Sequence, residues 1–264
     1  MIGSNQVEYP WLDESITNFF TQKIFEFYWG DSANLFDLTG FKTTMRDMNR
    51  LNMTVYQGDA AINQPSYSYY QGNSYFSTVY DRGALAVETL DNLMGDSLSN
   101  NFWRKYFDTY KFAHPTPKDF RELILEAAGN NLAIVYDILF ESTVAVDFSV
   151  SNLSNSRLDS TDVEISFVLH RKGGIDYPID YRIYLSNGDS LDYQWISKYN
   201  TEEIIRQSSY PAVSILIDPD NKWAVDANLL NNSVFINPDN KPGFRLSAGI
   251  MFLIESLLSF AGGI

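Results

Sequence analysis

Apolar residues recur with two different periods along this chain, and the period changes near residue 145. Before that position they are spaced by three and four, as on one face of a helix. The clearest run has apolar members at i, i+3, i+4, i+8 and i+11: Ile16, Phe19, Phe20, Ile24 and Phe27. Gly30 follows this run, so we expect the helix to end there.

Further helical segments are predicted in the first half, with a short polar one at about 40–50. The others cover about 77–93, 100–110, 118–128 and 132–140. Short helices joined by short turns are typical of an α-helical bundle. Residues 57–75 instead are rich in Gln, Asn, Ser, Tyr and Gly, which predicts a long polar-aromatic loop. Such loops in compact domains are often binding loops or lids.

From Ala145 onward apolar residues occupy every second position, which is the period of a strand. The alternating positions are Val146, Phe148 and Val150, then Val163, Ile165, Phe167 and Leu169, then Tyr181, Ile183 and Leu185. Asn187-Gly188 is a strong hairpin signal, and a short buried strand is expected at 213–217. Short strands separated by turn residues predict a β-sandwich of immunoglobulin-like size over residues 145–240.

The last segment, residues 244–264, is mostly apolar. Its apolar positions fall at heptad spacing: Leu246, Ile250, Leu253, Leu257 and Phe260. Glu255 interrupts the segment, and neither side of it is long enough to span a bilayer. We expect a docked C-terminal helix over residues 241–264. The alternative is the cut-off membrane anchor of a longer parent protein.

Composition narrows the functional classes. The net charge of −14 argues against nucleic acid as a partner, because binding a phosphate backbone needs clustered Lys and Arg. Without cysteine there is no disulfide, thiolate metal site or cysteine nucleophile. The two histidines, His114 and His170, lie in unlike segments, so a metal site built on both is not expected. The first residues lack a basic segment followed by an apolar one, so we do not expect them to be a signal peptide. An extracytoplasmic or membrane-associated location is only slightly favoured over a cytoplasmic one.

The segment Tyr9-Pro10-Trp11-Leu12-Asp13-Glu14 resembles the Trp-Leu-Asn-Glu segment of the M1 family of zinc metallopeptidases, the gluzincin aminopeptidases. In that family the Glu is the third protein ligand of the catalytic zinc and follows a His-Glu-x-x-His helix by about eighteen residues. The resemblance implies that Glu14 is a zinc ligand and that the two His ligands lie upstream of Met1. The chain would then be the back part of a peptidase.

A second motif supports the resemblance. The segment Val79-Tyr80-Asp81-Arg82-Gly83-Ala84 looks like the family's Tyr-Glu-Lys-Gly-Ala segment, whose Tyr hydroxyl stabilises the oxyanion of the tetrahedral intermediate. The resemblance therefore implies that Tyr80 is catalytic. Glu14 and Tyr80 are 66 positions apart, similar to the family's distance, and the pattern continues downstream to about residue 140. Asp13 departs from the usual Asn.

Structural explanations compete with each of these assignments. Acidic residues at a helix N-terminus are favoured by the helix dipole, and a helical Tyr is usually a core residue. Arg82 is expected to pair with a carboxylate. Oxygen-bearing residues are also concentrated at 218–232. Calcium binding is one explanation, and turn chemistry at strand ends is the stronger one. These residues are Asp218, Asp220, Asn221, Asp226, Asn228, Asn231 and Asn232.

The fold class we expect is α+β and multidomain. Residues 1–144 would form the helical C-terminal part of a gluzincin catalytic domain, residues 145–240 a β-sandwich domain, and residues 241–264 a helix. The resemblance implies Zn²⁺ and a peptide substrate for the intact parent, with the isolated chain inactive. A non-catalytic binding or scaffolding module is the alternative.

Overall fold

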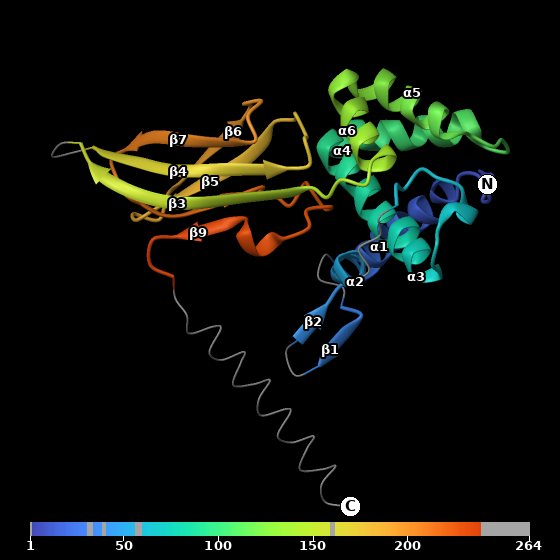
Figure 1. Cartoon of the computed structure of the whole chain (residues 1–264), viewed down its shortest axis with the longest axis horizontal. Helices are drawn as coiled ribbons and strands as arrows, with labels where there is room; N and C mark the ends of the chain where they lie inside the picture. The colour runs from blue at the N-terminus through green and yellow to red at the C-terminus, as the bar shows by residue number, and fades with distance from the viewer. Residues whose placement is uncertain (1, 31–33, 39–40, 56–59, 159–161, 239–264) are drawn as a thin grey trace, which may run out of the picture.

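The computed structural model describes residues 2–30, 34–38, 41–55, 60–158 and 162–238 (Figure 1). Helices fill the first half and antiparallel strands the second, so the chain has a mixed helix-and-sheet fold, as the change of period predicted. The helices are α1 (Trp11–Trp29), α2 (Met45–Val55), α3 (Gly72–Tyr75), η2 (Phe76–Arg82), α4 (Gly83–Tyr110), α5 (Pro117–Ala128) and α6 (Asn130–Glu141). Two single turns, η1 (Ser66–Ser68) and η3 (Leu229–Asn231), lie in loops.

Helix α1 packs against α4, and its first turn also contacts α5 and α6. Trp11 is fully buried, and its ring lies 4.5 Å from that of Phe140 and 5.3 Å from that of Phe120. The expected apolar face of α1 is only partly a core face, because Ile24 and Phe27 are 53% and 81% exposed. Both side chains therefore keep more than half of their surface exposed. That part of the prediction was wrong.

Helices α3, η2 and α4 follow one another without a loop. The middle piece, η2, is a π-helix, which places one extra residue in the helical path. The predicted stop at Gly95 is confirmed, because its φ of 72° and ψ of 160° break α4 internally. The hairpin of β1 (Phe36–Leu38) and β2 (Phe41–Thr43) was not predicted.

The second half holds two antiparallel sheets. The first has the order β3 (Asp147–Arg157), β4 (Val163–Lys172), β7 (Thr201–Ser208). The second has the order β6 (Ser190–Trp195), β5 (Ile179–Leu185), β8 (Ala212–Ile217), β9 (Ser233–Phe235). The hairpin at Asn187-Gly188 is confirmed, with Gly188 at a φ of 92°.

The buried faces of the two sheets meet. The ring of Phe167 on β4 lies 5.5 Å from that of Tyr181 on β5, and both side chains are fully buried. The side chain of Asn155 on β3 both accepts from the N–H of Ala212 on β8 and donates to its carbonyl, at 2.9 Å each. Apolar alternation in the strands therefore builds a core between the sheets.

A loop after β8 joins the sheets to the helices (Figure 1). The N–H of Val225 donates to the Thr89 hydroxyl on α4 at 3.3 Å, and the Asn92 amide donates to the Lys222 carbonyl at 3.3 Å. Trp223 between them is buried against Phe148. The two halves thus share one continuous set of buried apolar residues.

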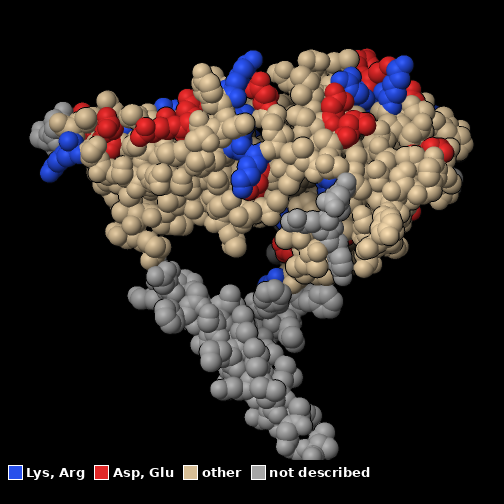
Figure 2. Space-filling view, viewed as in Figure 1, with Lys and Arg blue, Asp and Glu red and all other residues tan. Residues whose placement is uncertain are grey.

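Charged side chains gather along one edge of the molecule in the view of Figure 2, above β7 and above α5 and α6. Much of the remaining surface in that view is uncharged. The predicted C-terminal helix at 241–264 lies outside the described residues. Among the described helices, none combines the length and the apolar character needed to cross a membrane.

Candidate functional site

Glu14 lies in the first turn of α1, and its backbone is held firmly. Pro10 precedes the helix, and Asp13 and Glu14 are the acidic residues of its first turn, where the helix dipole favours them. The buried Trp11 anchors this turn, and its indole N–H donates to the Asn63 side chain at 3.0 Å. Glu14 itself is half-buried. The first turn therefore presents a carboxylate from a fixed backbone.

Tyr80 lies in the π-helix η2, which two side chains of α1 hold in place. The Ser15 hydroxyl donates to the Val79 carbonyl at 2.6 Å, and the Asn18 amide donates to the Tyr80 carbonyl at 3.0 Å. Gly83 lets the helices approach closely, because a β-carbon there would overlap the Ser15 side chain. These contacts fix Tyr80 relative to the start of α1.

The structure brings Glu14 and Tyr80 together. The Tyr80 hydroxyl lies close enough to the Glu14 carboxylate for that carboxylate to affect its ionisation. Burial raises the pKa of Tyr80, and the neighbouring Glu14 carboxylate raises it further. The phenol is therefore a neutral hydrogen-bond donor at neutral pH. A donor of this kind on a fixed helix can stabilise negative charge that develops on an atom within its reach.

Tyrosines from the preceding segment surround this pair. Burial raises the pKa of Tyr75, and the negative charge of Glu14 raises it further. The Tyr75 ring lies 6.1 Å from the Tyr80 ring and 5.2 Å from the Tyr69 ring. Next to them is a hollow of about 290 Å³ that Tyr69 and Tyr75 line together with Gln71.

Sequence reasoning did not single out Tyr75. It proposed only that residues 57–75 form a binding loop. The described part, from residue 60, is ordered by bonds such as that from the N–H of Ser66 to the Val7 carbonyl at 2.8 Å. The only sequence signal available was the density of tyrosines in that segment.

Asp81 and Arg82 connect the π-helix to neighbouring segments through hydrogen bonds. Asp81 is 9% exposed and accepts from the Asn52 amide at 3.3 Å, and burial raises its pKa to about 6. The Arg82 guanidinium donates to the carbonyls of Ala60 and Ser142, at 3.2 and 3.0 Å. The expectation that Arg82 pairs with a carboxylate was therefore wrong, because these two carbonyls use its donors.

Residues 5–139, which include both Glu14 and Tyr80, match the sequence model of the Peptidase family M1 domain. The chain belongs to peptidase family M1. Legionella pneumophila aminopeptidase A, solved in complex with aspartic acid, has a similar fold at 18% sequence identity and a TM-score of 0.54. The match covers 83% of this chain and 24% of that one, so this M1 chain spans about a quarter of its length. No curated protein matches the chain significantly.

The described part of this M1 chain does not assemble a zinc site by itself. A catalytic zinc takes three protein ligands, and the described residues contain no group of three His, Asp or Glu side chains placed to hold a metal. Glu14 is a single carboxylate. His170 lies on β4, where its ring contacts the hydroxyls of Ser151 and Thr201 at 3.1 Å each. His114 is exposed beside Gly3.

The two aspartates at the centre of the oxygen-rich segment 218–232 accept hydrogen bonds from nearby backbone N–H groups. The Asp218 carboxylate accepts from the N–H groups of Lys222 and Trp223 at 2.9 Å each. The Asp226 carboxylate accepts from the N–H of Asn228 at 3.0 Å and from the Asn232 amide at 2.9 Å. Both carboxylates shape the loop that joins the two halves, as turn chemistry predicts.

Proposed function

We propose that this chain carries one part of the active site of a zinc-dependent peptidase that hydrolyses peptide bonds. Within it, Glu14 is a metal ligand and Tyr80 donates a hydrogen bond to the reacting carbonyl oxygen. The observation that carries the proposal is that Ser15 and Asn18 of α1 hold η2 in place, so that Tyr80 lies beside Glu14, 66 positions away in the family's other motif.

The remaining metal ligands must come from outside the residues described. The chain has two histidines and no cysteine, and neither histidine lies beside Glu14 in a three-ligand group. We therefore expect the isolated chain to be inactive. What this chain supplies is a positioned carboxylate and a neutral phenol.

The role of Tyr80 follows from its chemistry. When a peptide carbonyl carbon becomes tetrahedral, its oxygen gains negative charge. The Tyr80 hydroxyl, which lies beside Glu14, can donate to such an oxygen because it keeps its proton at neutral pH. Because η2 is fixed to α1 by Ser15 and Asn18, only the O–H bond has to turn toward that oxygen. The contribution is greater in the transition state than in the bound substrate.

We also propose how the chain is divided into domains. Residues 1–144 would form the helical part of the catalytic domain, and residues 145–240 an immunoglobulin-like sandwich that supports it. The rings that face one another between the two sheets support this arrangement. Its ionisable residues at 218–226 stabilise a loop and are not expected to take part in catalysis.

A substitution in the full-length gene product that contains this chain tests the assignment of Tyr80. Tyr80→Phe should lower kcat by about 10²–10³ and leave KM nearly unchanged, because only a transition-state donor is lost. Tyr70→Phe, at a side chain that is 95% exposed, is the matched control. Equal turnover by Tyr80→Phe and the parent would show that Tyr80 has only a packing role.

Metal analysis tests the assignment of Glu14. The purified and dialysed 264-residue chain should hold far less than one zinc per molecule, and Glu14→Gln should remove most zinc from the full-length product. Stoichiometric zinc in the isolated chain would contradict the incomplete site. A full-length product that neither binds zinc nor cleaves peptides would favour the binding or scaffolding module.

A further inference from the structure

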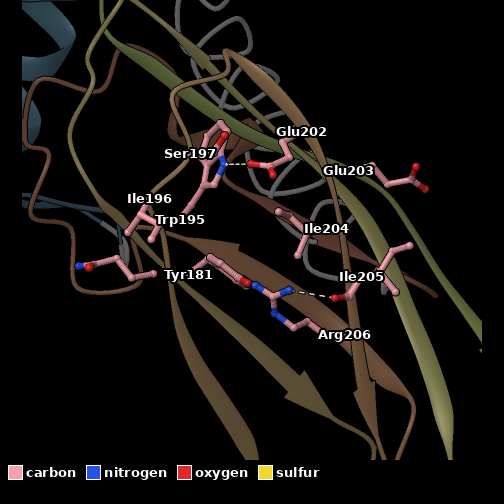
Figure 3. A pocket seen from close by; sticks show the side chains of 10 residues that line it. Tyr181, Trp195, Ile196, Ser197, Glu202, Glu203, Ile204, Ile205 and Arg206 are labelled. Atoms are coloured by element: carbon pink, nitrogen blue, oxygen red, sulfur yellow. Dashed lines mark hydrogen bonds between the residues drawn. The ribbon is translucent and has the colours of Figure 1, made fainter.

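A second cavity lies in the sheet half of the molecule, apart from Glu14 and Tyr80. Its volume is about 420 Å³, and it opens between β6 and β7, each of which is an edge strand of its sheet (Figure 3). Tyr181, Trp195 and Ile204 form its inner wall, and their exposed fractions are 0%, 2% and 7%. The inner wall is therefore aromatic and aliphatic.

Two hydrogen-bond donors in this cavity have no acceptor in the described part of the chain. One is the Tyr181 hydroxyl and the other is Nε of Arg206, and both atoms are buried. The Tyr181 hydroxyl faces the Arg206 guanidinium (Figure 3), which can only donate and so cannot take the hydroxyl proton. A buried donor without an acceptor is costly, and folded proteins seldom leave one unless a ligand or water meets it.

Packing holds Arg206 at this place. Its guanidinium lies 4.9 Å from the centre of the Tyr193 ring and 5.9 Å from that of Tyr181. One terminal nitrogen, Nη1, donates to the Ile205 carbonyl at 2.9 Å. The guanidinium is therefore kept beside the Tyr181 hydroxyl, with Nε still unused.

The carboxylates near the cavity are engaged elsewhere. Glu202 accepts from the indole N–H of Trp195 at 2.6 Å. Glu203 accepts from the Ser166 hydroxyl at 3.1 Å, and its side chain points away from Arg206 and Tyr181 (Figure 3). Among the described residues, no anionic side chain thus neutralises this pair of donors.

We propose that the cavity between β6 and β7 binds a carboxylate group attached to an aromatic or aliphatic body. Arg206 and Tyr181 would donate to the carboxylate oxygens, since a guanidinium and a neighbouring hydroxyl match two oxygens of one anion. The body would lie against Trp195 and Ile204, because pockets of this kind combine an apolar wall with few polar groups. A free amino acid and the C-terminus of a peptide both present this chemistry.

Calorimetric titration of the 264-residue chain tests the proposal with four probes. They are N-acetyl-L-phenylalanine, its primary amide, free L-phenylalanine and the peptide N-acetyl-Ala-Ala-Phe. The acid should bind saturably, and the amide, which lacks the carboxylate, should not. Tighter binding of the peptide than of the free amino acid would identify a peptide C-terminus as the ligand, and the reverse order would identify an amino acid.

Two substitutions locate the binding. Tyr181→Phe keeps the ring and removes only the hydroxyl, and Arg206→Gln removes the charge and the fork of donors. Each should weaken binding of the acid by about ten- to a hundredfold, the usual effect of losing one hydrogen bond to a charged group. Tyr210→Phe and Arg157→Gln, at exposed positions outside the cavity, are the matched controls and should bind as the parent does.

Three results would overturn the proposal. The first is equal binding of the acid and its amide. The second is unchanged binding in Tyr181→Phe, a variant expected to fold because the ring is retained. The third is the absence of saturation by any carboxylate probe up to about 10 mM, well above the range of a specific small-molecule site.

Discussion

At the scale of single residues, Asp81 is a buried carboxyl whose charge opposes folding. Its pKa is raised to about 6, while an unfolded Asp titrates near about 3.9. Because the folded-state pKa is the higher one, stability from the protonated form is present below about pH 4 and is lost as pH rises through about 6. The cost of this charge is thus greatest at neutral pH.

Asp81→Asn should remove this pH dependence and keep an oxygen for the Asn52 amide. Relative to the parent, the variant should gain about 1–3 kcal/mol in unfolding free energy between pH 4 and pH 7.5. Urea unfolding at several pH values measures the difference, with Asp96→Asn, at an exposed position, as control. A constant difference across that pH range would show that Asp81 titrates normally.

Some residues of the candidate site could be identified from the sequence, and others could not. Glu14 and Tyr80 could be singled out because two short motifs occur in order at the right spacing. Tyr75 could not, because its segment has no period and the packing of its ring against Tyr80 and Tyr69 depends on a local turn of the chain. Arg82 was misjudged because a carbonyl partner leaves no trace in the sequence, whereas carboxylates are conspicuous.

At the scale of elements, the contact between α1 and η2 depends on the absence of a side chain at Gly83. Gly83→Ala would place a β-carbon against Ser15 and push the two helices apart. We expect a loss of about 1–3 kcal/mol in unfolding free energy, the usual cost of overpacking a filled interior. Thermal unfolding checks this. Gly72→Ala, in a short helix with open space around the site, is the control and should have little effect.

A double-mutant cycle distinguishes the close contact from a simple propensity effect. Shortening the neighbour as well, in Ser15→Gly with Gly83→Ala, should recover part of the loss. Additive effects of the two changes would mean that the two positions do not interact.

Elements with a clear period were the ones that could be predicted. Strands β4 and β5 bury every second residue, so their alternation is visible. Strand β7 has only Ile204 buried, and β9 has three residues, so neither carries enough apolar contrast to be recognised. The π-helix is also invisible to a pattern search, because its apolar residues fit an ordinary helix nearly as well.

At the scale of the whole molecule, the Thr89 hydroxyl connects the helical half to the sheet half. It donates to the Leu85 carbonyl within α4 at 2.8 Å and accepts from the N–H of Val225. Thr89→Val keeps the shape but leaves that buried N–H without a partner. The loss should be about 1–3 kcal/mol.

Differential scanning calorimetry checks the effect of Thr89→Val on the single transition that we expect for two halves with a continuous core. Thr21→Val is the matched control. The Thr21 hydroxyl makes the same kind of hydrogen bond, to the Thr17 carbonyl, but among the described residues it makes none to the sheet half. Equal losses in both variants would mean that the bond to Val225 adds nothing.

The joint between the halves could not be predicted from the sequence. The bond from Asn92 to Lys222 links positions 130 residues apart, and neither segment is marked by composition. The change of period showed where helices give way to strands. It gave no information on how the two parts meet.

The π-helix gives this M1 chain an unusual sensitivity to changes in length. Each residue turns an α-helix by about 100° and advances it by about 1.5 Å. Deleting one residue between Phe76 and Arg82 would allow an ordinary helix, but everything before the deletion would rotate by that angle relative to α4. Tyr75 and Tyr80 could then no longer face Glu14 together. Among related chains, substitutions in this stretch should therefore be far more common than gaps.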